Sequence, residues 1–133
     1  MIFIPGKPRG KGRPRFTRGG GVYTDPQTKA YEQKIASEYH RSGGALFEDV
    51  PVKVFIEVRY GIPKSESRKM QMAMQRDKVL PTKKPDIDNV VKIVMDALNG
   101  VAYTDDKQVI DLYARKVYST QEGVVIAVER WSA

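Results

Sequence analysis

Alternating apolar and polar residues predict strands most clearly between residues 52 and 60. The apolar members of this segment are Val52, Val54, Ile56, Val58 and Tyr60, and charged residues occupy three of the four positions between them. A period of two predicts a strand with one apolar face. Residues 108–118 and 123–131 also read as strands. The polar turn at 119–123 joins them, so the pattern predicts a hairpin.

Helical spacing first appears after Asp25, which can cap the free amide groups of a helix beginning at Pro26. Its apolar positions recur every four residues, at Tyr31, Ile35 and Tyr39. The pair Gly43-Gly44 is expected to end this helix. His40 falls in the last turn, where we expect an exposed side chain without a functional role.

Two further helices are predicted in the second half of the chain. Residues 65–79 are expected to form a basic helix, with Ser65 or Ser67 as its cap and most of its methionines packed in the core. Residues 88–99 are expected to form a helix that Asn99-Gly100 ends. The buried side of this last helix is predicted to contain Val90, Val91, Val94 and Leu98.

The elements follow in the order strand, arm, helix, strand, helix, helix, strand, strand. This order predicts an α+β (mixed α/β) fold, in which a three- to four-stranded mixed sheet packs with about three helices. A length of 133 residues suits a single domain over residues 1–133. We expect a basic, flexible arm at about residues 5–23 of this domain.

The composition excludes several classes of site. The chain has no cysteine and one histidine, which rules out disulfides, thiolate zinc sites, cysteine nucleophiles and metal sites built from several histidines. The glycine-rich phosphate-binding motifs are absent, so we expect no nucleotide cofactor. No apolar run suits a signal peptide or a membrane span, and we expect a cytoplasmic protein.

Charge is distributed unevenly along the chain, whose net charge is +7. Residues 1–24 contain six basic and no acidic residues, and residues 64–84 contain seven basic and two acidic ones. Residues 85–111 reverse the sign, with six aspartates against two lysines. An acidic segment between two basic ones suits an enzyme that binds cations in the middle and phosphate on either side.

The basic residues of the arm occupy every second position, at Lys7, Arg9, Lys11, Arg13 and Arg15. In an extended chain these side chains project largely to one side, as a row of phosphate contacts requires. Six glycines and three prolines at residues 5–21 favour irregular structure. A solvated loop without a fixed partner is the alternative.

The candidate chemistry is concentrated at residues 84–92, Lys-Pro-Asp-Ile-Asp-Asn-Val-Val-Lys. Pro85 disfavours helix before it, so Asp86 and Asp88 arrive where an extended or turn segment enters a helix, and both point to one face. Carboxylate oxygens are the ligands that Mg²⁺ prefers. Lys92 lies one turn further along the polar side of the helix.

A second acidic point, Asp105-Asp106, lies in a short turn that can fold back toward this polar side. One of its carboxylates would complete an oxygen site for phosphodiester hydrolysis, with Lys92 offsetting negative charge on the phosphate. Simpler interpretations remain open. The acids at the helix start can be caps, Asp88, Lys92 and Asp96 can form a surface ion-pair stripe, and Asp105-Asp106 can be turn residues.

Three linked motifs resemble the RusA family of Holliday junction resolvases. They are K-P-D-I-D-N-V-V-K at 84–92, M-D-A-L-N-G at 95–100 and D-D-K-Q-V at 105–109. The resemblance extends loosely to the arm and to residues 22–26. It implies a homodimeric, Mg²⁺-dependent endonuclease of bacterial or phage origin, in which Mn²⁺ can substitute. Such an enzyme makes paired symmetric nicks in four-way DNA and leaves 5′-phosphates.

The resemblance also implies roles for individual residues. Asp86, Asp88 and Asp106 would be the metal-binding acids and Lys92 the catalytic lysine, with Asp105 as the alternative third ligand. The implied DNA-binding residues are Lys7, Arg9, Lys11, Arg13, Arg15, Phe16, Lys83 and Lys84. The phenylalanine would stack at the centre of the junction, or else anchor the core or a loop.

Three functions compete on this evidence. The first is a junction-resolving nuclease, and the second is a nuclease that cuts other branched DNA with the same site. The third is a non-enzymatic module that binds branched DNA, which requires Asp86, Asp88 and Asp106 to be replaceable. We expect Asp96 to be a structural partner of Lys92 rather than a metal ligand.

Overall fold

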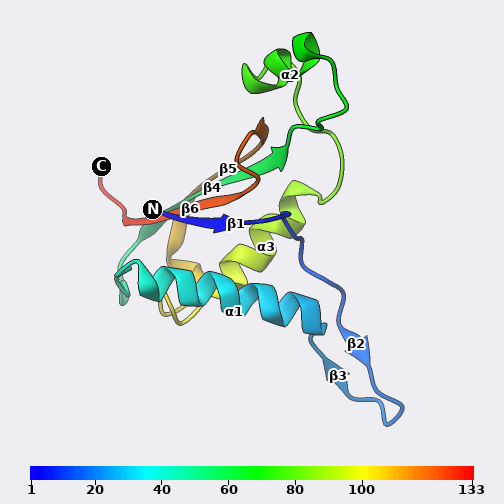
Figure 1. Ribbon diagram of the computed structural model, residues 1–133. Helices are drawn as coiled ribbons and strands as arrows, with labels where there is room; N and C mark the ends of the chain where they lie inside the picture. Colours follow the sequence, from blue (N-terminus) through cyan, green and yellow to red (C-terminus); the bar gives the residue numbers. More distant parts are fainter.

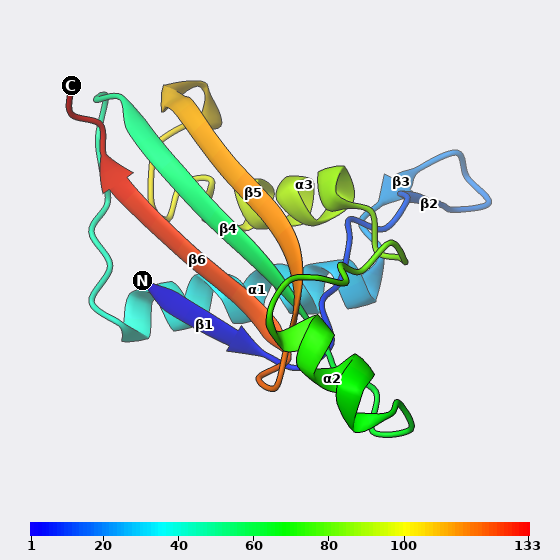
Figure 2. The same ribbon diagram turned by 90° about the horizontal axis from the view of Figure 1, so that it is seen from above.

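A four-stranded sheet in the order β1-β6-β4-β5 forms the centre of the computed structural model, which describes all residues 1–133 (Figure 1, Figure 2). Its strands are β1 (Ile2–Pro5), β4 (Val52–Gly61), β5 (Val109–Ser119) and β6 (Gly123–Arg130). β6 pairs antiparallel with β1 and with β4, whereas β4 and β5 are parallel. The sheet is therefore mixed, as predicted.

Three helices accompany this sheet, and two of them cover one face. α1 (Pro26–Arg41) and α3 (Ile87–Leu98) lie side by side on that face, whereas α2 (Arg68–Gln75) stands on the other side (Figure 1). The short 3-10 helix η1 (Asp106–Gln108) precedes β5. The predicted α+β fold of a single small domain, with a mixed sheet and about three helices, is confirmed.

The core lies between the sheet and the two helices α1 and α3. The predicted apolar face of β4 is confirmed, since Val52, Val54, Ile56, Val58 and Tyr60 are all buried. The helices contribute Tyr31, Ile35, Tyr39, Val90, Ile93, Val94 and Leu98. Each such side chain stabilises the fold by about 1.5–3 kcal/mol through burial. α3, which has Asp86 as its cap residue and Asp88 in its first turn, is therefore fixed firmly on the sheet.

The boundaries of α1 agree with the sequence prediction. The Asp25 carboxylate accepts a hydrogen bond from the Thr28 amide at 3.2 Å, and Pro26 occupies the first helical position. Ser42 caps the other end, and Gly43 follows with a φ of 78°, a conformation that glycine adopts without strain. His40 is exposed in the last turn, as expected.

The predicted hairpin between the last two strands is wrong, because β4 lies between β5 and β6. The connecting turn instead crosses the end of β4, where the Glu122 carboxylate accepts a hydrogen bond from the Gly61 amide at 3.1 Å. The two strands differ in burial. Val124, Val125 and Ile126 are all buried, so β6 is apolar on both faces and suits a position inside the sheet, whereas β5 forms its edge.

The predicted basic helix at residues 65–79 is shorter than expected, and Ser67 rather than Ser65 caps it. The Ser67 hydroxyl accepts a hydrogen bond from the Met70 amide at 3.1 Å. The expectation that most of its methionines pack in the core is also wrong. Met74 is buried, but Met70 and Met72 are exposed, because α2 touches the sheet along one narrow side only.

The N-terminal arm contains a two-stranded ribbon that the sequence did not predict. β2 (Arg15–Phe16) and β3 (Val22–Tyr23) pair antiparallel and project beyond the start of α1 (Figure 2). The Thr17 amide closes the ribbon with a 2.7 Å hydrogen bond to the Gly21 carbonyl.

No helix of the structure is long and apolar enough to cross a membrane.

Candidate active site

The acids at residues 86 and 88 lie at the start of α3 with their carboxylates free. Asp86 has the extended backbone of a helix cap, but its side chain makes no capping hydrogen bond. Asp88 lies in the first turn, and both residues are exposed. Neither carboxylate takes part in an ion pair within 4.0 Å. The capping interpretation of Asp86 therefore has no support in the hydrogen bonding of the helix.

The polar side of α3 carries a small charge network. The Lys92 Nζ lies 3.8 Å from the Asp96 Oδ2, which is the predicted pair. Lys11 from the arm binds the same oxygen at 3.0 Å and also binds the Glu32 Oε2 at 2.9 Å. Burial opposes the charge of Lys11, but the two carboxylates outweigh it and raise its pKa. Asp96 is thus held by two lysines.

The turn before β5 separates the roles of its two aspartates. The Asp105 carboxylate accepts a hydrogen bond from the Lys107 amide at 2.9 Å, and the Gln108 Oε1 accepts one from the Asp105 amide at 3.0 Å. This reciprocal arrangement is a capping box, so Asp105 has a structural function. Asp106 has no such bond to the backbone and is exposed, which favours it as the third ligand.

The charge of Asp106 interacts with two charged residues on the polar side of α3, Lys92 and Asp96. Partial burial, the neighbouring Asp105 and the charge of Asp96 raise the pKa of the Asp106 carboxyl, and the charge of Lys92 opposes this shift. The three acids 96, 105 and 106 thus concentrate negative charge around the end of the helix. A cation bound at this point would relieve their repulsion.

A basic hollow of about 600 Å³ joins the arm to the start of α3. No hydrophobic residue lines it. Its charged and amide side chains are Lys7, Arg9, Lys11, Arg13, Lys84, Asp86 and Asn89. The Lys11 amide donates a 2.9 Å hydrogen bond to the Asn89 carbonyl, and a Cβ on Gly10 would lie only 2.9 Å from the Asn89 Cβ. The arm therefore packs directly against the start of α3.

The basic residues of the arm do not all face the same way. Lys11 turns inward to its two carboxylates, whereas Arg9 binds the Gln27 side chain at 3.0 Å and Arg15 binds Asp25 at 2.8 Å. Lys7 and Arg13 are exposed and line the hollow. The expected one-sided row is therefore interrupted at Lys11, because the acids of α1 and α3 attract it.

Phe16 and the basic pair Lys83-Lys84 are also placed by the structure. Phe16 lies on the ribbon with 76% of its surface exposed, so it does not anchor the core. Lys84 is exposed at the rim of the hollow. The Lys83 Nζ lies over the rings of Tyr60 and Tyr118, at 5.9 and 5.6 Å from their centres.

Two residues that the sequence analysis did not single out support the segment before Asp86. The Tyr60 hydroxyl donates a 2.7 Å hydrogen bond to the Pro85 carbonyl, and the Lys116 Nζ donates one of 2.6 Å to the Lys83 carbonyl. Burial, followed by the negative charge of Asp86, raises the pKa of Tyr60 to about 12, so this hydroxyl remains a donor. The sequence contained only one sign of this role, namely that both residues occupy positions of predicted strands whose side chains point toward the core.

The donor chemistry of Asp86, Asp88 and Asp106 suits a hard cation such as Mg²⁺. All three are exposed carboxylates, and Asp106 is crowded by like charge. The structure contains no group of three or more acidic or histidine side chains close enough to hold a metal ion. Asp86, Asp88 and Asp106 are therefore not gathered around a single point.

Comparison with known proteins agrees with the motifs. The family model described as endodeoxyribonuclease RusA matches residues 5–129. An uncharacterized protein of Bacillus subtilis (strain 168), YqaN, is 37% identical over an alignment of 135 positions, and the match covers 98% of this chain and 95% of that protein.

Proposed function

The chain belongs to the RusA family of endodeoxyribonucleases, and we propose that it resolves four-way DNA junctions by paired, Mg²⁺-dependent, symmetric nicks. The observation that most supports this proposal is the basic hollow that opens beside Asp86. A DNA phosphate held by Lys7, Arg13 and Lys84 comes to lie next to the carboxylates at the start of α3. The phosphate to be cut is thereby placed beside the acids that are proposed to bind the metal.

Each residue has a distinct part in the proposed reaction. Asp86, Asp88 and Asp106 would hold the metal through carboxylate oxygens. When bound, Mg²⁺ would lower the pKa of a water and offset charge on the scissile phosphate. Lys92 would stabilise negative charge that develops on the phosphate oxygens. Breaking the bond to the 3′ oxygen leaves a 3′-hydroxyl and a 5′-phosphate, which a ligase can rejoin.

The direct test compares a synthetic four-way junction with a linear duplex of the same sequence. We expect nicks at symmetric positions in the junction alone, present with Mg²⁺ or Mn²⁺, absent with EDTA and sealed by ligase. Cutting of flaps or forks in preference to four-way DNA would favour a nuclease for other branched DNA. Tight junction binding without cutting under any metal condition would favour the binding module.

The arm is expected to dominate the salt dependence of DNA binding. Replacing Lys7, Arg9 and Arg13 by alanine removes three phosphate contacts from the hollow. The slope of log affinity against log salt concentration should fall by about 2–3, because each contact contributes about 0.7–0.9. The slope is measured by fluorescence anisotropy of a labelled junction between low and moderate salt.

A charge-matched control shows whether these residues act by position or only by net charge. It carries three alanines at exposed basic residues that line neither the basic hollow nor the apolar face of the sheet, namely Arg41, Lys69 and Arg76. The control should keep most of the wild-type slope. Equal slopes for the two triple variants would contradict a specific role for the arm.

Paired nicks require two copies of the site, and the edge strand β5 is the surface that we propose for their association. Four successive residues of β5, at 110–113, are exposed. Successive side chains of a strand point to opposite faces, so both faces of this stretch are uncovered. Ile110, Leu112 and Tyr113 are its apolar members. An exposed edge of this kind presents unpaired amide and carbonyl groups that can pair with a strand of a second chain.

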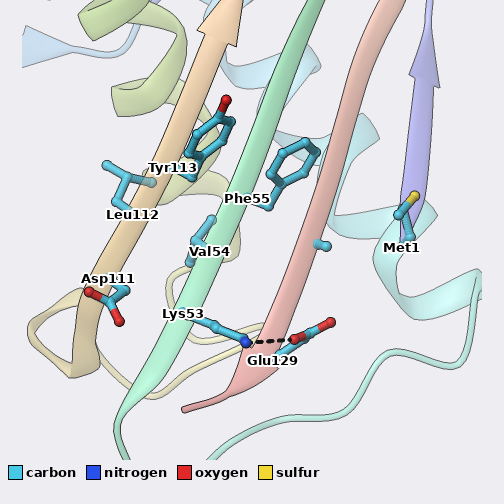
Figure 3. A pocket seen from close by; sticks show the side chains of 9 residues that line it. Met1, Lys53, Val54, Phe55, Asp111, Leu112, Tyr113 and Glu129 are labelled. Atoms are coloured by element: carbon cyan, nitrogen blue, oxygen red, sulfur yellow. Dashed lines mark ion pairs between the residues drawn. The ribbon is translucent and has the colours of Figure 1, made fainter. Parts of the chain in front are cut away.

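The face of the sheet beside this edge fits a second copy better than it fits DNA. Figure 3 shows Phe55 and Tyr113 side by side on this face, with ring centres 5.4 Å apart. They belong to a mostly apolar hollow of about 610 Å³. Its one lysine, Lys53, pairs with Glu129 at 3.3 Å, and Asp111 also lines it. The paired lysine and the two acidic side chains make this hollow a poor site for phosphate.

The sequence of β5 is self-complementary when it pairs with a copy of itself. An antiparallel pairing centred on Tyr113 sets Asp111 opposite Arg115 of the second copy. It also sets Leu112 opposite Ala114. Opposite charges directly across two strands each contribute about 0.2–1 kcal/mol. The resulting twofold symmetry matches the symmetry of a four-way junction.

A charge introduced at this edge should prevent association. Leu112→Lys is expected to convert a dimer into a monomer in analytical ultracentrifugation, because it places an ammonium group in the apolar contact, opposite Ala114 of the second copy. Met72→Lys is the matched control, since the two side chains are similarly exposed, at 42% for Met72 and 45% for Leu112. A Leu112→Lys protein that remains fully dimeric would exclude β5 as the interface.

A further inference from the structure

The segment that leads into α3 is held by side chains rather than by its own backbone. Between Leu80 and Pro85 no amide or carbonyl group forms a hydrogen bond with another backbone group. This segment also lies outside every helix and strand. Its position next to Asp86 therefore depends on the side chains that reach it from the sheet.

Two neighbouring strands supply these side chains. Tyr60 lies on β4 and Lys116 lies on β5, and the parallel register places Tyr118 directly beside Tyr60. The Lys116 Nζ is 5.2 Å from the centre of the Tyr60 ring, so the two donors support each other. Tyr60 is 4% exposed and belongs to the main core. Tyr60 is thus fixed in the core, and Lys116 lies beside it on the neighbouring strand.

These donors form hydrogen bonds with the carbonyl groups of the two residues on either side of Lys84. Lys116 donates to the Lys83 carbonyl at 2.6 Å, and Tyr60 donates to the Pro85 carbonyl at 2.7 Å. The Pro85 carbonyl and the Asp86 Cα belong to one planar peptide unit. A bond that fixes this oxygen therefore fixes the point from which the Asp86 side chain extends.

We propose that Tyr60 and Lys116 are positioning residues that hold the Asp86 carboxylate in place for metal binding. This inference rests on the proposed role of Asp86 as a metal ligand. Groups that orient metal ligands commonly change affinity by about tenfold or more when they are removed. The Lys83 ammonium group over the rings of Tyr60 and Tyr118 adds a third attachment of the same segment to the sheet.

The test measures metal binding directly, in the full-length protein without DNA. Mn²⁺ is titrated and the free ion is followed by electron paramagnetic resonance. Tyr60→Phe removes the hydroxyl but keeps the ring, and Lys116→Met removes the ammonium group but keeps the chain length. Each variant should weaken Mn²⁺ binding by about tenfold. Unchanged affinity in both, with wild-type protein that binds Mn²⁺, would overturn the positioning role and leave the metal site standing.

Tyr39→Phe is the matched control for the loss of a tyrosine hydroxyl. The Tyr39 hydroxyl also donates to a backbone carbonyl, that of Ala45, but at the far end of α1. Its removal should lower the melting temperature as much as Tyr60→Phe does and leave the Mn²⁺ affinity unchanged. An equal loss of affinity in both variants would mean that Tyr60 acts only through general stability.

A double-mutant cycle shows whether Tyr60 acts through Asp86. In an Asp86→Asn background the Tyr60→Phe change should have no further effect on Mn²⁺ affinity, because the ligand that it positions is already lost. If the double variant instead loses the product of the two single losses in Mn²⁺ affinity, Tyr60 acts independently of Asp86 and the inference is overturned. Wild-type protein that binds no Mn²⁺ at millimolar concentration would overturn the inference and the proposed metal-dependent function together.

Discussion

Replacing Asp88 by asparagine is expected to reduce the cutting of a four-way junction by at least about a hundredfold while leaving junction binding intact. Asparagine keeps the shape of the side chain but removes the negative charge that a hard cation requires. Asp88 is exposed in the first turn of α3. Its loss should therefore cost only the helix-dipole contribution of about 0.3–1 kcal/mol in folding stability.

The measurement is a single-turnover cleavage rate with excess enzyme, and the dissociation constant of the junction is measured in EDTA. Asp77→Asn is the control, because Asp77 is an exposed acid with a φ of 58° that asparagine also tolerates. Its cleavage rate should equal that of the wild type. Full activity of the Asp88→Asn protein would leave Asp88 with a structural function only.

Lys92→Ala is expected to slow cutting by about a hundredfold to a thousandfold without weakening junction binding. Lys92 is exposed on the polar side of α3, and its weak pairing with Asp96 at 3.8 Å leaves its charge available to a phosphate. A group that stabilises charge only as the reaction proceeds changes the rate constant and not the affinity. The single-turnover cleavage rate at saturating enzyme and the dissociation constant of the junction in EDTA separate an effect on the reaction from an effect on binding.

Lys29→Ala serves as the control for this variant, since Lys29 is an exposed lysine on α1. It should cut at the wild-type rate. A Lys92→Ala protein whose only defect is weaker DNA binding would make Lys92 a further phosphate contact. Undiminished cutting would remove Lys92 from the proposed reaction.

The sequence predicted the elements that depend on local signals. The alternation at residues 52–60 specifies a buried face and the cap at Asp25 specifies a helix start, and the structure contains both. The predicted buried side of α3 is confirmed at Val90, Val94 and Leu98, whereas Val91 is only partly buried. The position of β5 depends on non-local pairing, because a parallel partner can lie far away in the chain. No local pattern distinguishes such a strand from one arm of a hairpin.

The candidate site was predictable as a set of residues but not as an arrangement. The motifs identified the acids at 86, 88 and 106, and the capping box at Asp105 supports the choice of Asp106 over its neighbour. The inward turn of Lys11 toward Glu32 and Asp96 had no signal, because the attracting acids lie 21 and 85 positions along the chain. The hydrogen bond from Tyr60 to the Pro85 carbonyl could not be predicted for the same reason, because the two residues are 25 positions apart.

The order of the strands has a consequence for the synthesis of the protein. β6 follows every other strand along the chain, yet it lies between β1 and β4 in the sheet. On the ribosome, a nascent chain can therefore already carry all of the proposed site residues and still lack the strand that joins the two halves of its core. The sheet can be completed only after residues 123–130 have left the exit tunnel. A DNA-cutting activity that depends on this sheet would then arise only after that point, later than the synthesis of the site residues themselves.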